Sequence, residues 1–193
     1  MKNLITFLLI FSVCVPLFSQ NTDWKPEDII HTKYVSGAAF SPNSSMVVWT
    51  QRKGLTKEDK FVNDIYLTRL DMLKDGKPRS FQLTNSDDSD FNTIFSRDGE
   101  FIYFLSSREK GKKLWRLNLY GGEPEKVQDF ENGISNMDWL NNQEIIFKAE
   151  EGKTLYDITY EKDNTVIVED STHWNAERLY SFNIKSKEIK RLT

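Results

Sequence analysis

The chain has 193 residues, of which 38% are hydrophobic and 13% aromatic, and its formal net charge is −3. This apolar content predicts a packed core and excludes an intrinsically disordered chain. The 26 lysines and arginines are scattered rather than clustered, which excludes a nucleic-acid-binding surface of the usual basic kind. The chain is long enough for one domain, or for one large piece of a domain.

The first 20 residues have the layout of a secretory signal peptide. Lys2 supplies the positive start, residues 4–18 form an almost continuous apolar run, and the chain turns polar from Ser19. A run of about 15 residues is short for a membrane-spanning helix, so we expect cleavage after Ser19 or Gln20 and no membrane span afterwards. An uncleaved anchor and a lipoprotein acylated at Cys14 are the alternatives.

Cys14 is the single cysteine of the chain, and it would leave with the signal peptide. The mature protein would then have no disulfide, no thiol nucleophile and no thiolate metal ligand. Export without disulfides favours a bacterial protein, periplasmic or secreted, over a small disulfide-stapled domain. We therefore expect its stability to come from the core.

After a lead-in at residues 21–33, where residues 25–31 could form a short helical turn, the sequence contains an internal repeat. Each copy has an aromatic residue, a polar turn and a short β-branched and aromatic run. Asp98-Gly99 is a strong hairpin signal, because glycine accepts positive φ and aspartate tolerates it. The runs lack strict alternation, which is typical of strands buried on both faces. The copies are residues 40–49, 95–104 and 139–147.

A second pattern follows each copy. It begins with an apolar residue and an aromatic residue and then alternates with a period of two, as expected of a half-exposed strand. A turn and a short final strand come next, and two of these final strands contain the same Leu-Thr pair. The alternating strands are residues 65–70, 114–119 and 179–184, and the final strands are residues 81–84, 125–127 and 189–193.

Each repeat thus holds four short strands in about 45 to 60 residues, the size of one propeller blade. We predict an all-β fold, a partial β-propeller of about three four-stranded antiparallel blades. The blades are expected at about residues 34–85, 91–131 and 134–193, the third with an insertion near residues 150–177. Because three blades would expose two apolar blade faces, we expect the chain to belong to a longer protein.

The second copy, Phe-Ser-Arg-Asp-Gly-Glu-Phe-Ile-Tyr-Phe, closely resembles the WD40-like (PD40) β-propeller repeat of TolB. The same repeat occurs in the propeller of prolyl-oligopeptidase-family (S9) serine peptidases. Together with the signal peptide and the lead-in from Trp24 to Ile29, the layout resembles a secreted bacterial member of the acylaminoacyl- or dipeptidyl-peptidase type. The resemblance covers residues 24–193, and it is more specific for a propeller than for a peptidase.

In that peptidase family the propeller caps a C-terminal α/β-hydrolase domain with a Ser-Asp-His triad. This sequence has no Gly-x-Ser-x-Gly elbow, so no catalytic residue can be assigned to it. We interpret His31 as a surface or capping histidine. His173 lies beside Asp170 and Ser171, which as sequence neighbours cannot easily form a triad with it. A contact of His173 with another domain or a ligand is the alternative.

Two polar segments resemble binding sites, but we predict neither a cofactor nor a metal site. Residues 85–90 resemble a calcium loop but lack the spacing and closing glutamate of an EF-hand, so we expect a solvated inter-blade loop. Residues 110–113 form a basic turn, with phosphate binding as a weak alternative, and residues 52–60 form an exposed charged loop. The aromatic residues at strand positions are expected in the core: Trp49, Tyr103, Phe104, Trp115, Trp139 and Phe147.

Three functions remain open. The first is the propeller part of an exported serine peptidase, whose partners would be its remaining blades, its hydrolase domain and peptide substrates. The second is a non-enzymatic TolB-like propeller that binds proteins of the cell envelope. The third is a short repeat protein that closes a ring by oligomerising. A Gly-x-Ser-x-Gly motif downstream would separate the first from the others.

Overall fold

The computed structural model describes residues 25–193, with the exception of residues 56, 110, 131 and 153–175. The predicted signal peptide, His173 and most of the predicted insertion lie outside the described residues. Within the part that is described, no helix has the length and apolar character needed to cross a membrane. α1 (Pro26–His31) is the short helical turn expected in the lead-in.

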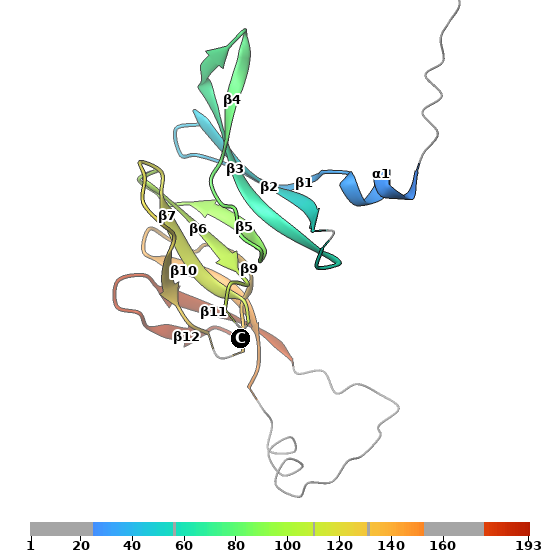
Figure 1. The fold of residues 1–193 in the computed structure, drawn as a ribbon. Coiled ribbons are helices and arrows are strands. Elements are labelled where there is room, and N and C mark those ends of the chain that lie inside the picture. Colours follow the sequence, from blue (N-terminus) through green and yellow to red (C-terminus); the bar gives the residue numbers. More distant parts are fainter. Residues whose placement is uncertain (1–24, 56, 110, 131, 153–175) are drawn as a thin grey trace, which may run out of the picture.

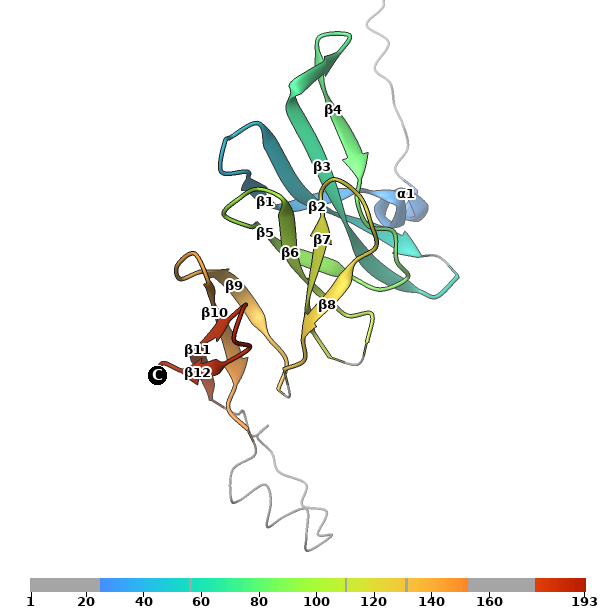
Figure 2. The same ribbon diagram turned by 90° about the vertical axis from the view of Figure 1, so that its left-hand side faces the viewer.

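The strands form three four-stranded antiparallel sheets, which confirms the predicted all-β architecture of three blades. Strands that follow one another in the chain lie side by side, so each blade is a meander. Figures 1 and 2 show the three sheets stacked in sequence order. Blade 1 contains β1 (Tyr34–Phe40), β2 (Met46–Leu55), β3 (Lys60–Lys74) and β4 (Lys77–Gln82); blade 2 contains β5 (Asp90–Phe95), β6 (Phe101–Ser106), β7 (Lys113–Asn118) and β8 (Glu125–Gln128); and blade 3 contains β9 (Ser135–Trp139), β10 (Glu144–Glu150), β11 (Glu177–Asn183) and β12 (Ile189–Arg191).

A serine holds the polar turn of the repeat in blades 1 and 2. The Ser96 hydroxyl donates to the Asp98 carboxylate and accepts from the first backbone N–H of β6. This hydroxyl lowers the pKa of the Asp98 carboxyl, so the carboxylate stays ionised. Ser41 and Asn43 make the corresponding bonds in blade 1. The serine of the repeat therefore fixes the turn in both blades.

The outer hairpin of blade 1 departs from the predicted bounds. The strands expected at residues 65–70 and 81–84 are instead β3, which is 15 residues long, and β4, which ends at Gln82. Asp75 and Gly76 form the turn between them with φ values of +52° and +74°, as a two-residue type I′ hairpin requires. The tip projects into solvent (Figure 1), and Leu73 is 64% exposed. Because the outer part of this hairpin is exposed, its two strands have no pattern of buried apolar residues from which their ends could have been predicted.

Strand β6, in the middle of the stack, contributes to both hydrophobic clusters because its alternate residues face opposite neighbours. Ile102 and Phe104 pack with residues of blade 1, whereas Tyr103 and Leu105 pack with residues of blade 3. None of the four is more than 5% exposed. The absence of alternation in this run is thus explained by burial on both faces, as predicted.

In every blade, an aromatic residue of the second strand is paired with an aromatic residue of the third strand. In blades 2 and 3 this aromatic pair lies on the face that packs against the preceding blade. Phe104 and Phe147, the second-strand members in blades 2 and 3, lie in the clusters between blades. In blade 1, the rings of Trp49 and Tyr66 stack with centroids 4.7 Å apart, on the face that no other described sheet covers. The three pairs are Trp49–Tyr66, Phe104–Trp115 and Phe147–Tyr180.

The inner strand of each blade has a β-bulge opposite the first aromatic residue of this pair. The first bulge residue is Gly37 in β1, Asn92 in β5 and Asn136 in β9, with φ values of +60°, +51° and +48°. Glycine and asparagine are the residue types that adopt this left-handed conformation most readily. The bulges therefore repeat from blade to blade, three residues before the aromatic residue that begins each copy of the sequence repeat.

Hydrogen bonds at the bulges join blade 2 to blade 3. With its amide oxygen toward blade 3, Asn92 accepts from the backbone N–H groups of Asn136, at 3.2 Å, and Met137, at 2.8 Å. Three residues further on, the indole Nε1 of Trp139 donates to the carbonyl oxygen of Phe95 at 2.6 Å. At the junction of blades 1 and 2 the equivalent bulge residue is a glycine, which has no side chain to do the same.

We expect Asn92→Gly to lower the free energy of unfolding by about 1–3 kcal/mol, because it leaves two backbone N–H groups without their acceptor. Glycine keeps the positive φ free of strain, but it loses more conformational entropy on folding, so the side-chain bonds are measured by the difference from a control that shares this cost. The matched control is Asn136→Gly, which makes the same change at nearly the same φ in an exposed residue. Urea denaturation of dilute protein measures both. Equal losses in the two variants would contradict the role of Asn92.

Candidate functional site

The described residues bring together no nucleophile, base and acid. His31, the one histidine among them, lies exposed in the last turn of α1, as a surface residue should. The predicted neighbours His173, Asp170 and Ser171 lie outside the described residues. The candidate sites among the described residues are therefore polar loops, recesses and sheet faces.

The loop at residues 85–90 is anchored at its end by an ion pair. Asp90 is fully buried at the start of β5, and its carboxylate receives two hydrogen bonds from the Arg108 guanidinium. The distances are 2.6 Å from Nη2 and 3.3 Å from Nε. Arg108 also lies over the rings of Phe104 and Trp115, at 5.9 and 5.4 Å from their centroids. The pair therefore fixes the entry of the chain into blade 2.

A second buried carboxylate holds the other end of this loop. Asp64 of β3 is fully buried, 2.6 Å from Nζ of Lys53, and it accepts hydrogen bonds from the Gln82 amide and the Ser86 backbone N–H. Both buried carboxylates thus already have cationic partners. No group of three or more His, Cys, Asp or Glu side chains suited to a metal occurs among the described residues. The structure accounts for this loop as an inter-blade connection.

One lysine of the basic turn near residues 110–113 is held in ion pairs. Lys113 lies 2.6 Å from the Asp129 carboxylate and 3.4 Å from that of Glu109. The hydrogen bond to Asp129 raises the pKa of Lys113. Lys126 joins the same network through Glu109, at 2.8 Å. At Lys113 these ion pairs favour the plain hairpin interpretation over phosphate binding, whereas Lys110 lies outside the described residues.

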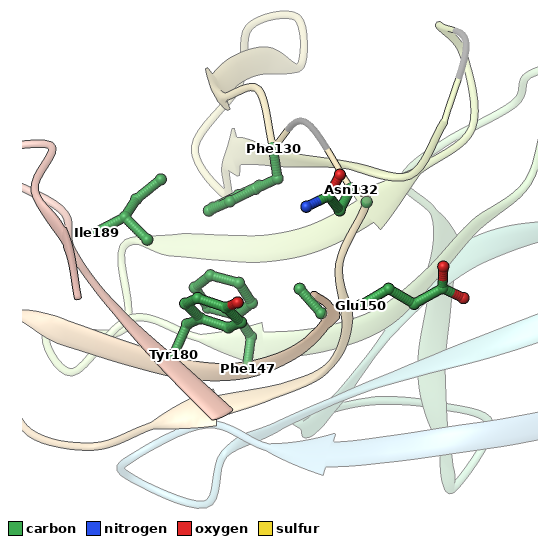
Figure 3. A pocket seen from close by; sticks show the side chains of 8 residues that line it. Phe130, Asn132, Phe147, Glu150, Tyr180 and Ile189 are labelled. Atoms are coloured by element: carbon green, nitrogen blue, oxygen red, sulfur yellow. The ribbon is translucent and has the colours of Figure 1, made fainter. Parts of the chain in front are cut away.

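An apolar recess of about 150 Å³ lies at the junction of blades 2 and 3. Figure 3 shows Phe130 on one side of it and the rings of Phe147 and Tyr180 on the other, with the Glu150 carboxylate pointing away. The ring centroids of Phe130 and Phe147 are 4.7 Å apart. Most of its lining side chains are apolar, so the recess offers apolar contact. The lining residues are Phe130, Asn132, Gly133, Phe147, Ala149, Glu150, Tyr180 and Ile189.

The comparisons with known proteins agree with this architecture. No protein-family profile and no curated protein matches the sequence. Among solved structures, a protein assigned as TolB from Agrobacterium tumefaciens is 20% identical, with a TM-score of 0.57 over 84% of this chain and 49% of that one. The acylaminoacyl peptidase of Pyrococcus horikoshii is 18% identical, with a TM-score of 0.59 over 88% of this chain and 26% of that one.

The isopeptidase AtxE2 is 11% identical, with a TM-score of 0.64 over 88% of this chain and 32% of that one. This chain has the blade architecture of a β-propeller, the fold that it shares with these three structures. It spans half or less of the length of each of these three proteins. The propeller repeat inferred from residues 95–104 is thereby confirmed as a fold.

Sequence reasoning missed the two buried ion pairs and the asparagine bulges of this propeller. The partners Asp90 and Arg108 are 18 positions apart, and only the register of β5 on β6 brings them together. The sequence did contain a signal from which the bulges could have been predicted. Gly37, Asn92 and Asn136 each stand three positions before the aromatic residue that opens a repeat, and all three are types that accept positive φ.

Proposed function

We propose that this chain is the propeller portion of an exported serine peptidase. A separate α/β-hydrolase domain would hydrolyse peptides, and the propeller would restrict the access of substrates to it. The observation that carries the proposal is structural likeness to an acylaminoacyl peptidase and an isopeptidase over 88% of this chain. The turn role of Ser41 and Ser96, whose hydroxyls are engaged in hydrogen bonds, agrees with a supporting domain.

Export is part of the same proposal. The apolar run at residues 4–18, preceded by Lys2 and followed by polar residues, favours passage through the secretory route. The described residues contain no cysteine, and the two inter-blade clusters supply the core that holds these blades together. Either the periplasm or the extracellular medium is consistent with these features.

A TolB-like propeller that binds envelope proteins is the second candidate. It is favoured by the 20% identity and the 49% coverage of the protein assigned as TolB, a larger share than for either peptidase compared here. In such a protein the blade faces and loops would bind partners, and no hydrolase domain would exist. The two candidates therefore differ in whether the gene product contains an activated serine.

A fluorophosphonate probe, which reacts covalently with activated serines, distinguishes the candidates. We expect the complete product of the gene to be labelled and to hydrolyse small peptide substrates. The 193-residue chain, as the matched control, should stay unlabelled. An unlabelled complete product that captures proteins of the cell envelope would reject the peptidase and support the TolB-like function.

A further inference from the structure

A recess of about 290 Å³ lies between blades 1 and 2, beside the polar turn that joins β1 to β2. Blade 1 supplies one wall of this recess, from β2, β3 and the polar turn, and blade 2 supplies the other wall, from its turns. Both walls belong to described blades that already pack on each other. The recess is therefore a feature of the junction itself and not of either outer face of the stack.

The floor of this recess is apolar but small. Leu67 is buried in the cluster that joins the two blades, and Met46 and Leu119 are half-buried against that cluster. The strands β2 and β3 each lie between two other strands, so neither presents a free edge to which a peptide strand could be added. Recognition in this recess depends on the side chains of its walls.

An ion pair forms part of the blade 1 wall. The Arg69 guanidinium donates two hydrogen bonds to the Asp71 carboxylate, at 2.8 Å from Nη2 and 3.0 Å from Nε. These bonds raise the pKa of Arg69 and lower the pKa of Asp71, so both groups stay ionised. Asp71 lies in a bulge of β3, where residues 70–72 have no register partner on β4. The pair places further N–H donors and carboxylate lone pairs side by side without a net charge.

The polar turn of blade 1 adds a hydrogen-bond donor to the same wall. Oδ1 of Asn43 accepts from the hydroxyls of Ser41 and Ser45 and from the backbone N–H of Ser45. Because this oxygen is engaged inside the turn, the Nδ2 group is what Asn43 offers to the recess that it lines. The corresponding residue of blade 2 is Asp98, whose carboxylate has no N–H group to donate. This donor is thus specific to the turn of blade 1.

An exposed aromatic ring completes the wall of blade 2. Tyr120 lines the recess, yet it is 83% exposed. Gly121 and Gly122 follow it with φ values of +132° and +108°, which residues with a side chain rarely adopt. No atom lies within 4 Å of the place where a Cβ of either glycine would stand, so the space beside the ring is open. Core packing does not explain this ring, whereas contact with a ligand would.

We propose that this recess binds a neutral saccharide whose rings, like glucose, carry equatorial hydroxyl groups. Such a ring has apolar C–H faces and a rim of hydroxyls that both donate and accept hydrogen bonds. One C–H face packs on the Tyr120 ring, while neighbouring hydroxyls donate to Asp71 and accept from Arg69 and the Asn43 amide. An anion would meet the Asp71 carboxylate and a cation would meet the Arg69 guanidinium, so the neutral pair favours an uncharged ligand. The inference is independent of the peptidase proposal, because it needs no hydrolase domain.

Nuclear magnetic resonance titration of the isotope-labelled 193-residue chain with cellotriose tests the proposal. We expect saturable shifts of the backbone signals around Arg69 and Tyr120. Tyr120→Ala and Arg69→Met should each weaken cellotriose binding by about tenfold, through the loss of a stacking contact or of hydrogen bonds to a charged group. Both variants should stay folded, because neither side chain lies in the core.

Two matched controls make the same chemical changes outside the recess. Arg116→Met also removes an arginine that donates two hydrogen bonds to an exposed carboxylate, that of Glu125. Tyr34→Ala removes another aromatic ring, which is 59% exposed. Neither residue lines the recess, so both control variants should bind cellotriose as the unmodified chain does.

Tetraalanine and trigalacturonate, titrated in the same way, separate the alternative ligands. The proposal is overturned if cellotriose causes no saturable shift, if its shifts lie away from the recess, or if both recess variants bind it as well as the controls do. Stronger binding of tetraalanine at the same signals would assign the recess to peptides and reject a saccharide. Stronger binding of trigalacturonate would show selection of an anion and reject a neutral ligand.

Discussion

Replacing Arg108 with methionine should lower the free energy of unfolding by about 3–5 kcal/mol, the cost of breaking a buried ion pair by removing one partner. The guanidinium carbon of Arg108 lies over the Phe104 and Trp115 rings, and methionine replaces it with an apolar group of similar reach, so most of the packing is preserved. What is lost is the cation beside Asp90, whose side chain is completely buried. Urea denaturation followed by tryptophan fluorescence measures the change.

The control for this prediction is Arg69→Met. Arg69 also makes two hydrogen bonds to one carboxylate, that of Asp71, but both side chains are well exposed. Water and salt screen such a pair, so its removal should leave the urea midpoint almost unchanged. Adding Asp90→Asn to Arg108→Met should recover part of the loss, because the buried charge is then absent. If Arg108→Met costs no more than Arg69→Met, the pair does not anchor blade 2.

Phe104→Ala should lower the free energy of unfolding by about 3–5 kcal/mol, because it leaves a cavity in a closely packed core. Phe104 is fully buried in the cluster that joins blade 1 to blade 2. In a stack of repeats, each blade is stabilised by its neighbours, so blade 1 should lose protection along with blade 2. Hydrogen exchange of the two sheets measures this coupling directly.

The matched control is Tyr120→Ala, which removes another aromatic ring from the same blade. Tyr120 is 83% exposed, so its removal should change neither the urea midpoint nor the exchange of blade 1. If Phe104→Ala destabilises blade 2 but leaves the protection of blade 1 intact, the two sheets are independent units and the stack is not a cooperative part of a propeller.

The parts of the fold that were predictable are those that depend on residues close together in sequence. Asp98-Gly99 and Asp75-Gly76 mark hairpins because their residue types accept the backbone angles of a tight turn. The run at β6 indicates burial on both faces because it lacks alternation, and two clusters of core residues bear this out. Local chemistry therefore predicts the blade count and the order of strands.

The parts that were not predictable depend on contacts between residues far apart in the sequence, within a blade or between blades. In the sequence, Asp90 is one of several acidic residues of a loop, and its ion pair exists only once β5 pairs with β6, which brings it to Arg108. In the sequence, nothing distinguishes Asn92 from an ordinary strand residue. Its hydrogen bonds to Asn136 and Met137 exist only once blade 3 has packed on blade 2. Residues whose role is to join repeats are defined by the stack, and a single repeat does not reveal them.

For the candidate site, too, the sequence predicted what depends on neighbouring residues and missed what depends on contacts between distant ones. The absence of a Gly-x-Ser-x-Gly elbow is a local property, and it predicted that no triad could be assigned to this sequence. The calcium-like appearance of residues 85–90 came from composition, and the structure explains the buried carboxylates at its two ends by their pairing with Lys53 and Arg108. Charged loops between blades thus serve to connect and orient the sheets.

The nucleotide sequence that follows the Thr193 codon in the source genome tests the central proposal most directly. We expect the reading frame to continue through further propeller repeats into a strand, a Gly-x-Ser-x-Gly turn and a helix, which together form the nucleophile elbow of an α/β-hydrolase. A stop codon at that position, or further repeats that end without such an elbow, would contradict the proposal that this propeller serves a serine peptidase.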